Sequence, residues 1–394
     1  MMDMPKRNKN INLSEILGFL LIMLVLFESI MNKLLITVLP INNVLGYLML
    51  SCSILVIITN KLYLNTAFLI FYIICCTVLL GSVIVIEGNP AKDYVIQFFS
   101  FGSCGIVCAM IKTDIKKVFY YGSISTIVFL IITFLQGFAD AKNSAFNFGY
   151  ALIPGFISTF YIFFNSWKKK KQCQTVLWMC IWITECVVLI RFCSRGNLIQ
   201  VYVFTILSAI ILFRKKLLGF IGIIAGTAAV VFIRPIIIVM YNIMVSLNIF
   251  ISVIWKNYWL ITTSDQSLLH GRTELYDVVW EGMDMKTALF GHGVGAYEMI
   301  TGTYVHNIFL QIFYETGLIG LVCMGFILFV FVKMMFSRTN TIYETELYIM
   351  VFVLGFVKLC FSSVHWRTSV FWFMVMAAFK QMSICKKMNV VVRM

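Results

Sequence analysis

Apolar residues form long runs along almost the whole chain, separated by short polar turns. A helix needs about 20 apolar residues to cross a bilayer, and twelve runs approach that length. They lie near residues 13–32, 34–59, 64–86, 94–111, 118–138, 148–166, 174–193, 197–213, 217–233, 316–334, 345–363 and 368–384. The pattern predicts an all-α, polytopic integral membrane protein with about twelve transmembrane helices, in which residues 1–394 form a single membrane domain.

Polar residues concentrate in one stretch, residues 235–305, between the ninth and tenth runs. We expect this stretch to be a sizeable loop with short helices. Within it, a helical pattern runs from Thr273 to Met285, with apolar residues on one face and acidic residues on the other. The acidic face is formed by Glu274, Asp277, Glu281 and Asp284. We interpret it as a solvated face of a helix that lies along a surface.

The composition excludes a soluble fold, because 61% of the residues are hydrophobic and 12% are charged, whereas soluble domains contain about 25% charged residues. Most of the 12 cysteines fall in apolar runs, so we interpret them as small apolar fillers and not as a disulfide framework. The basic N-terminal segment MMDMPKRNKN lacks a small-residue cleavage site. We expect the run that follows it to be an uncleaved first span.

The net charge of +14 indicates topology and not a nucleic-acid partner. With the N-terminus inside, 20 of the 31 basic residues fall on the cytoplasmic side and 11 fall outside or in the spans. The positive-inside rule therefore predicts that both termini are cytoplasmic. This orientation places the loop 235–305 outside, together with the turn 194–196 and all four histidines, His270, His292, His306 and His365. We expect the protein to work at that face.

Arginines lie near the outer ends of the predicted spans. Arg191 and Arg195 are four residues apart, so they share a face if the helix persists, and an anion such as a diphosphate would relieve their repulsion. The alternative is that both side chains extend to lipid headgroups. Arg234 ends the ninth run, where Pro235 predicts a helix stop. Arg272 precedes the loop helix, whose free amides favour an anion.

Two further segments of the outer face carry polar groups of interest. His292 and Gly293 belong to the turn GHGVGAY, whose glycines permit either a tight backbone path or the close approach of a ligand; no strand precedes the turn, so it is not a dinucleotide site. Asn307 suits a helix N-cap, with His306 just outside the helix and a short helix over 308–315 before the tenth span. His306 is either a hydrogen-bonded interface residue or a catalyst.

Charges also fall within the predicted spans, at Glu28, Glu185, Glu315 and Lys358. Each requires a partner or a water-filled cavity. No HExxH sequence or paired cysteine spacing supports zinc, so we predict neither a metal site nor a cofactor.

The segments SRGNL, HGRTELY, GHGVGAY and VHNIFLQIFYETGLIG occur in this order over residues 191–335. In this combination the chain resembles the O-antigen ligase and O-antigen polymerase superfamily of bacterial membrane glycosyltransferases. The element HN...E.GLIG is the most specific part. One departure is Tyr276, which stands where family members often carry tryptophan.

The resemblance implies a helical glycosyltransferase in the bacterial cytoplasmic membrane, with its active site facing outside. Its donor would be a polyprenyl-diphosphate-linked glycan, with no need for a metal or a nucleotide sugar. By the motifs, Arg195 and Arg272 would hold the diphosphate and His306 would serve the acceptor hydroxyl. The surrounding substrate-binding residues would be Arg191, Arg234, Asn307, His292 and Gly293.

Four functions remain open at this point. The protein could polymerise oligosaccharide repeats, transfer a finished glycan to another acceptor, or act as a transporter or flippase for lipid-linked sugars. A non-catalytic assembly partner would leave Arg195, Arg272 and His306 dispensable. We favour the polymerase, with donor, acceptor, membrane lipids and a chain-length regulator as partners and no nucleic acid.

Overall fold

Helices account for all the regular secondary structure of the described residues, which confirms the predicted all-α class. The computed structural model describes residues 13–38, 43–85, 91–137, 145–192, 194–212, 233–251, 272–337 and 339–391, with the short pieces 254–255, 258–259 and 262.

The first half of the chain contributes α1 (Leu13–Leu26), α2 (Glu28–Val38), α3 (Val44–Thr59), η1 (Leu62–Leu64), α4 (Thr66–Val85), α5 (Ala91–Gln97), η2 (Phe98–Gly102), α6 (Ser103–Met110), α7 (Ile115–Leu135) and α9 (Ala145–Lys168). The second half contributes α10 (Gln172–Phe192), α11 (Arg195–Leu212), α13 (Ile233–Ser246), α15 (Arg272–Glu281), α16 (Met285–Phe290), α17 (Ala296–Thr301), α18 (Ile308–Met335), α19 (Ile342–Phe352), η3 (Val353–Val357), η4 (Lys358–Cys360) and α20 (Ser369–Val391).

Six helical stretches of the described residues are long and apolar enough to cross a membrane, or seven if α1 and α2 form one bent span. The six are Thr66–Ile84, Ala91–Met110, Ile115–Leu135, Asn147–Lys168, Gln172–Phe192 and Ile308–Met335. Each coincides with a predicted run. The run predicted over 217–233 lies outside the described residues except for its last position. The total of twelve spans stays a prediction.

The first predicted run, 13–32, does not form one straight span. The chain bends by 94° between α1 and α2, and the fully buried Phe27 lies at the bend. Its ring occupies the space beside Gly122 of α7, where a side-chain carbon would come within 2.0 Å of the ring. The run 34–59 is divided in turn, since α2 ends at Val38 and α3 begins at Val44. Hydropathy reports how readily a residue leaves water for an apolar environment. It carries no information on where the axis of a helix bends, so these breaks could not be read from the apolar runs.

The loop helix and the tenth span also differ from a simple run. The helix predicted over 273–285 ends at Glu281, because Asp284 caps a second helix, α16, through a capping box with Thr287. The short helix predicted before the tenth span is confirmed, since α18 kinks at Gly317 (φ 66°, ψ −164°), nine residues after it begins.

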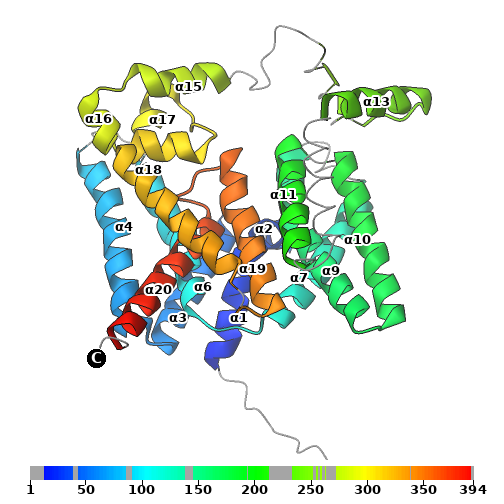
Figure 1. Ribbon diagram of the computed structural model, residues 1–394, viewed down its shortest axis with the longest axis horizontal. Coiled ribbons are helices and arrows are strands. Elements are labelled where there is room, and N and C mark those ends of the chain that lie inside the picture. The colour runs from blue at the N-terminus through cyan, green and yellow to red at the C-terminus, as the bar shows by residue number, and fades with distance from the viewer. Residues whose placement is uncertain are drawn as a thin grey trace, which may run out of the picture.

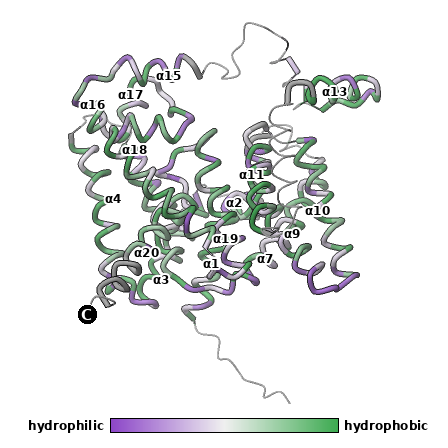
Figure 2. The backbone as a smooth tube through the Cα atoms, in the orientation of Figure 1, coloured by the Kyte–Doolittle hydropathy of each residue, from purple (hydrophilic) through white to green (hydrophobic). Residues whose placement is uncertain are grey.

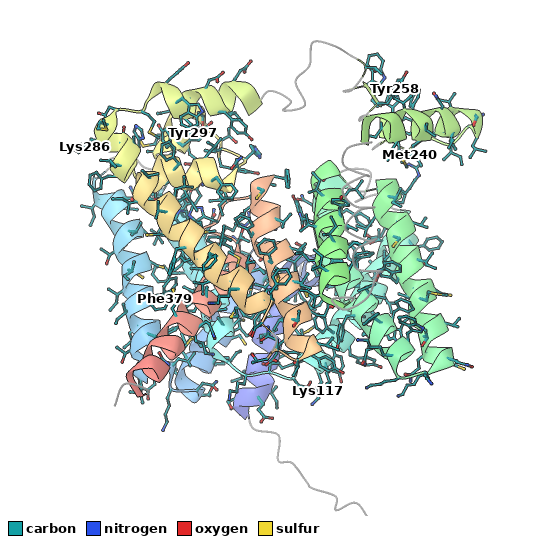
Figure 3. The ribbon with its side chains drawn as sticks, in the orientation of Figure 1. Lys117, Met240, Tyr258, Lys286, Tyr297 and Phe379 are labelled. Carbon is teal, nitrogen blue, oxygen red and sulfur yellow. The ribbon has the colours of Figure 1, made fainter. Side chains whose placement is uncertain are left out.

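The short helices of the loop gather at one end of the helical bundle (Figure 1). There α15, α16 and α17 lie above α4 and the first turns of α18, and α13 lies to one side. Figure 3 shows Lys286 and Tyr297 at this end and Lys117 at the opposite end. Hydrophobic residues occupy most of the length of the long helices between the two ends (Figure 2).

Candidate functional site

A cavity of about 720 Å³ lies where α2, α5, α7 and α9 meet the segment 358–368. Hydroxyl and amide groups contribute much of its lining, among them Asn32, Gln97, Asn147, Ser362 and Thr368. Three tyrosines, Tyr94, Tyr150 and Tyr304, also line it. A polar cavity of this size between apolar helices has room for a polar ligand.

Two helix breaks supply part of this polar wall. The bend after α1 directs Glu28 and the following turn of α2 to the cavity. On the other side, α19 passes through the π-helical η3 into η4, and the chain then leaves helical geometry over residues 361–368. Irregular backbone at membrane depth is tolerated where it lines a cavity. The predicted span over 345–363 is therefore interrupted at the point where its polar residues line the cavity.

The charged groups of the cavity include Glu28, Lys358 and Arg367. The Lys358 ammonium lies 4.8 Å from the centroid of the Tyr150 ring, and the Arg367 guanidinium lies 5.7 Å from that of Phe101. The Glu28 carboxylate accepts a hydrogen bond of 2.9 Å from Ser369. Glu28 and Lys358, two of the intramembrane charges that the sequence singled out, thus face one cavity.

His306 adjoins this cavity through Tyr304. The two rings lie 4.0 Å apart, and the Tyr304 hydroxyl is 3.4 Å from the Ser362 hydroxyl across the cavity wall. His306 is half-buried and adopts a left-handed backbone conformation (φ 58°), which non-glycine residues seldom adopt. Asn307 caps α18, because its side chain accepts from the backbone N–H of Phe309 at 2.9 Å and of Leu310 at 3.4 Å. The cap predicted at Asn307 is confirmed.

The first turn of α11 adjoins the same cavity from another side. A side-chain carbon at Gly196 would lie 3.5 Å from the Tyr150 hydroxyl and 3.5 Å from Phe361. Arg195 is the first residue of this helix, although its side chain lies outside the described part. The structure therefore brings the backbone at Arg195 and the segment 304–306 to a common cavity.

Arg191 does not share a helix face with Arg195, because α10 ends at Phe192 and a new helix begins at Arg195. The expectation depended on a continuous helix and is wrong in that respect. The Arg191 guanidinium lies over the ring of Phe192, 5.3 Å from its centroid. This position fits a side chain at an apolar boundary.

Arg234 and Arg272 each lie at the start of a helix. Arg272 is the first residue of α15, whereas the sequence placed it directly before this helix. Arg234 lies in the first turn of α13, so Pro235 belongs to a helix start, where proline is tolerated. The helix stop predicted for the ninth run concerns residues outside the described part of the chain. The side chains of both arginines lie outside the described residues. Residues of α15, α17, α18 and the segment that joins the last two form one small core, Val279, Tyr297, Val305 and Tyr314. This core fixes α15 beside the turn that carries His306.

The turn of His292 and Gly293 packs its backbone against the kink of α18. The N–H groups of these two residues donate to the carbonyls of Tyr314 and Glu315 at 2.8 and 3.0 Å. The kink at Gly317 removes the helical partners of those carbonyls, so the turn replaces them. The His292 ring stacks on Tyr314 at 4.3 Å, and its Nε2 lies 2.9 Å from the Gly282 carbonyl. The glycines thus provide the tight backbone path, one of the two roles expected of them.

Two carboxylates hold the surrounding segments together. Tyr94, which lines the cavity, donates a short hydrogen bond of 2.6 Å to Glu298 of α17, and burial raises the pKa of the Glu298 carboxyl. Glu315 of α18 accepts from Gln311 at 2.9 Å and from Trp366 at 3.0 Å. His365 lies 3.6 Å from the same carboxylate. Glu315 thereby fixes the helix that follows His306 against the segment that carries Arg367.

Sequence reasoning found part of this site and missed the rest. It named Glu28, Glu315 and Lys358 as charges that require partners, but it gave no role to Tyr94, Glu298 or Arg367. The signal for Arg367 was its position between two apolar runs on the outer side. No group of three or more histidine, cysteine or acidic side chains in the described part of the chain is arranged to hold a metal ion.

Residues 178–325 match the protein family described as O-antigen ligase. The match confirms, over that part of the chain, the resemblance that the motifs indicate. It runs from α10 through the kink of α18 and includes the start of α11, the helices of the loop and the segment 304–307. No curated protein matches the chain.

Proposed function

We propose that the protein is a glycosyltransferase of the bacterial cytoplasmic membrane that moves a glycan from a polyprenyl-diphosphate carrier to an acceptor hydroxyl. One observation carries the proposal: the start of α11 and the segment 304–306 lie at one polar cavity, and both belong to the stretch that matches the O-antigen ligase family. A membrane enzyme that handles glycans needs such a cavity beside its cationic groups.

In the proposed reaction, the acceptor oxygen attacks the anomeric carbon while the bond from that carbon to the diphosphate oxygen breaks. The electron pair leaves with the diphosphate, whose growing negative charge Arg195 and Arg272 stabilise. His306, as neutral imidazole, removes the proton from the acceptor hydroxyl. The displacement is in line, so it inverts the anomeric carbon, and it requires no metal. Arg191, Arg234, Asn307, His292 and Gly293 complete the proposed substrate-binding set, the last three through the backbone around α18.

The acceptor separates two versions of the proposal. A polymerase adds the glycan to another repeat unit, whereas a ligase transfers it to a different molecule. The match to the family described as O-antigen ligase does not decide between these versions, because it does not identify the acceptor. We keep the polymerase as the first proposal and the ligase as the alternative, with a chain-length regulator as partner of the former.

The site lies on the outer face in this proposal. The loop helices α15–α17 and the segment 304–306 lie at the end of the bundle opposite Lys117 (Figure 3), and the lysine-rich turn 168–171 lies at the same end as Lys117 (Figure 2). The positive-inside rule assigns the lysine-rich end to the cytoplasm. Both termini would then be cytoplasmic.

Replacing the two arginines tests the proposed function. Arg195→Ala and Arg272→Ala should each abolish glycan transfer in membranes supplied with the native lipid-linked donor, while the protein remains inserted and abundant. Lysine at either position should restore little activity, because a point charge does not reproduce the bidentate guanidinium.

Arg338→Ala replaces an arginine that the positive-inside rule assigns to the cytoplasmic side; it is the control and should retain activity. Near-normal product from both alanine variants at positions 195 and 272 would refute the proposal, and contacts with lipid headgroups would then explain these arginines better.

A further inference from the structure

The described lining of the cavity carries more positive than negative charge. Lys33, Lys358 and Arg367 line it, whereas Glu28 is the one carboxylate among its described lining residues. A cavity that is lined mainly by one sign of charge, between low-dielectric walls, attracts ligands of the opposite charge. The cavity therefore favours an anionic ligand over a neutral one.

Lys358 and Arg367 are the cations best placed to bind such a ligand. Neither forms an ion pair shorter than 4.0 Å within the described residues. Lys358 begins η4, where the helix unwinds at the cavity, and its ammonium lies above the ring of Tyr150. Glu28 offsets only part of the positive charge of the three cations, and its carboxylate accepts a hydrogen bond from Ser369. Arg367 follows Trp366, whose indole is fixed by Glu315, so its backbone is held in place.

The remaining lining suits a carbohydrate. Side chains such as Asn32, Gln97, Asn147 and Ser363 offer paired donors and acceptors for sugar hydroxyls. Tyr94 and Tyr304 add aromatic surface and phenolic groups. A volume of about 720 Å³ lies within the range of ligand pockets, about 300–1,000 Å³.

If the proposed function holds, Arg195 and Arg272 already offset the two negative charges of the carrier's diphosphate. The excess positive charge of the cavity lining is then available for another anionic group. We propose that the cavity binds the glycan part of the substrate, and that Lys358 and Arg367 bind an anionic substituent on one of its sugars, a carboxylate or a phosphoester. This inference rests on the proposed function and adds the class of glycan: acidic.

Transfer kinetics with the native donor and with a charge-free donor test the inference. The native glycan is analysed for acidic sugars, and its charge is then removed by reduction of the carboxylate to the alcohol or by cleavage of the phosphoester. Lys358→Gln and Arg367→Gln should each raise KM for the native donor by about 10- to 100-fold, the effect of losing a hydrogen bond to a charged group. Removing the charge from the donor should raise KM of the parent protein by a similar factor and should change KM of the two variants little.

Two control variants and the exposed position of Arg367 make the test specific. Lys333→Gln, an exposed lysine of α18 away from the cavity, should behave as the parent protein. Lys358→Arg keeps the positive charge, so its KM for the native donor should stay close to that of the parent protein. A loss of the fold at this position would impair both Lys358 variants, whereas a loss of charge impairs only Lys358→Gln. Arg367 is exposed, so Arg367→Gln should insert normally even if Lys358→Gln does not.

A neutral native glycan would overturn the inference, as would variants that remain equally impaired with both donors. Loss of inorganic pyrophosphate binding in Lys358→Gln and Arg367→Gln would also overturn it, because these residues would then bind the diphosphate. Absence of transfer by the parent protein would instead refute the proposed function itself.

Discussion

Substitution of Gly291 by alanine should disrupt the contact between the loop and the kink of α18. Gly291 has φ 78° and ψ 177°, a region that is almost exclusive to glycine. A side-chain carbon at this position would lie 2.4 Å from the carbonyl of Glu315. Because this contact is with backbone, either the turn or the kink must move.

The magnitude follows from the bonds that such a movement breaks. Backbone strain costs about 1–3 kcal/mol. The hydrogen bonds of the 292 and 293 N–H groups to Tyr314 and Glu315 contribute about 0.5–1.5 kcal/mol each. Gly291→Ala should therefore lower the free energy of unfolding of this region by about 2–6 kcal/mol.

Gly302→Ala is a matched control. Gly302 also has a positive φ, 69°, but nothing lies within 4 Å of the position where its side-chain carbon would be. Its cost is the left-handed conformation alone, about 1–2 kcal/mol.

The two variants are compared by melting in detergent and by protease cleavage of the loop 282–306. Gly291→Ala should melt lower, be cleaved faster and lose glycan transfer, because His306 depends on the position of α18. Equal melting and cleavage of the two variants would refute the argument. The strain of a positive φ would then explain both, with no contribution from contact between the side chain at position 291 and the Glu315 carbonyl.

Three further predictions follow from the topology and the buried groups. Engineered cysteines near Asp265 and Thr301 should react with impermeant reagents from outside and one near Lys169 only from the cytoplasm, and the reverse pattern would refute the orientation. His306→Ala should lower turnover by about 10²- to 10⁴-fold with donor binding largely retained. The rate of the parent protein should rise with pH through the imidazole pKa. A variant that fails to bind the donor but keeps this pH profile would instead make His306 a diphosphate ligand. Burial raises the pKa of Glu298 above 4.5, so the parent protein should lose stability as the pH rises from that value through the raised pKa. Glu298→Gln should therefore show a flatter pH dependence of melting than Glu274→Gln, a control at an exposed position.

The long helices could be predicted because their apolar runs match the bilayer thickness. The runs at 64–86, 118–138 and 174–193 coincide with α4, α7 and α10, since nothing within them interrupts the pattern. The bend at Phe27 and the unwinding at η3 and η4 could not be predicted in this way. Phe27 and the five residues of η3 are apolar and packed in the core, with Phe27 and Val353 fully buried, so hydropathy does not distinguish them from a straight helix.

The candidate site could be predicted where a local rule applied. Asn307 has the side chain of an N-cap, and the structure places it as one. The turn at Gly291 could be predicted as tight, but its partner could not, because the carbonyl of Glu315 becomes available only through the kink at Gly317. Likewise, Tyr94 and Glu298 are 204 residues apart, and no pattern along the chain relates them.

Helix breaks mark this site more directly than the motifs do. In a bilayer, a backbone that leaves helical geometry must find new hydrogen-bond partners or face water, so a break is retained only where the fold satisfies it. Glu28 directly follows the bend at Phe27, Lys358 lies where the α19 segment unwinds, and both line the cavity. The kink at Gly317 is satisfied by the turn of His292, which fixes the helix preceded by His306. Restoring a straight helix at any of these breaks would therefore remove a cavity charge or displace His306, even though it would add hydrogen bonds within the helix.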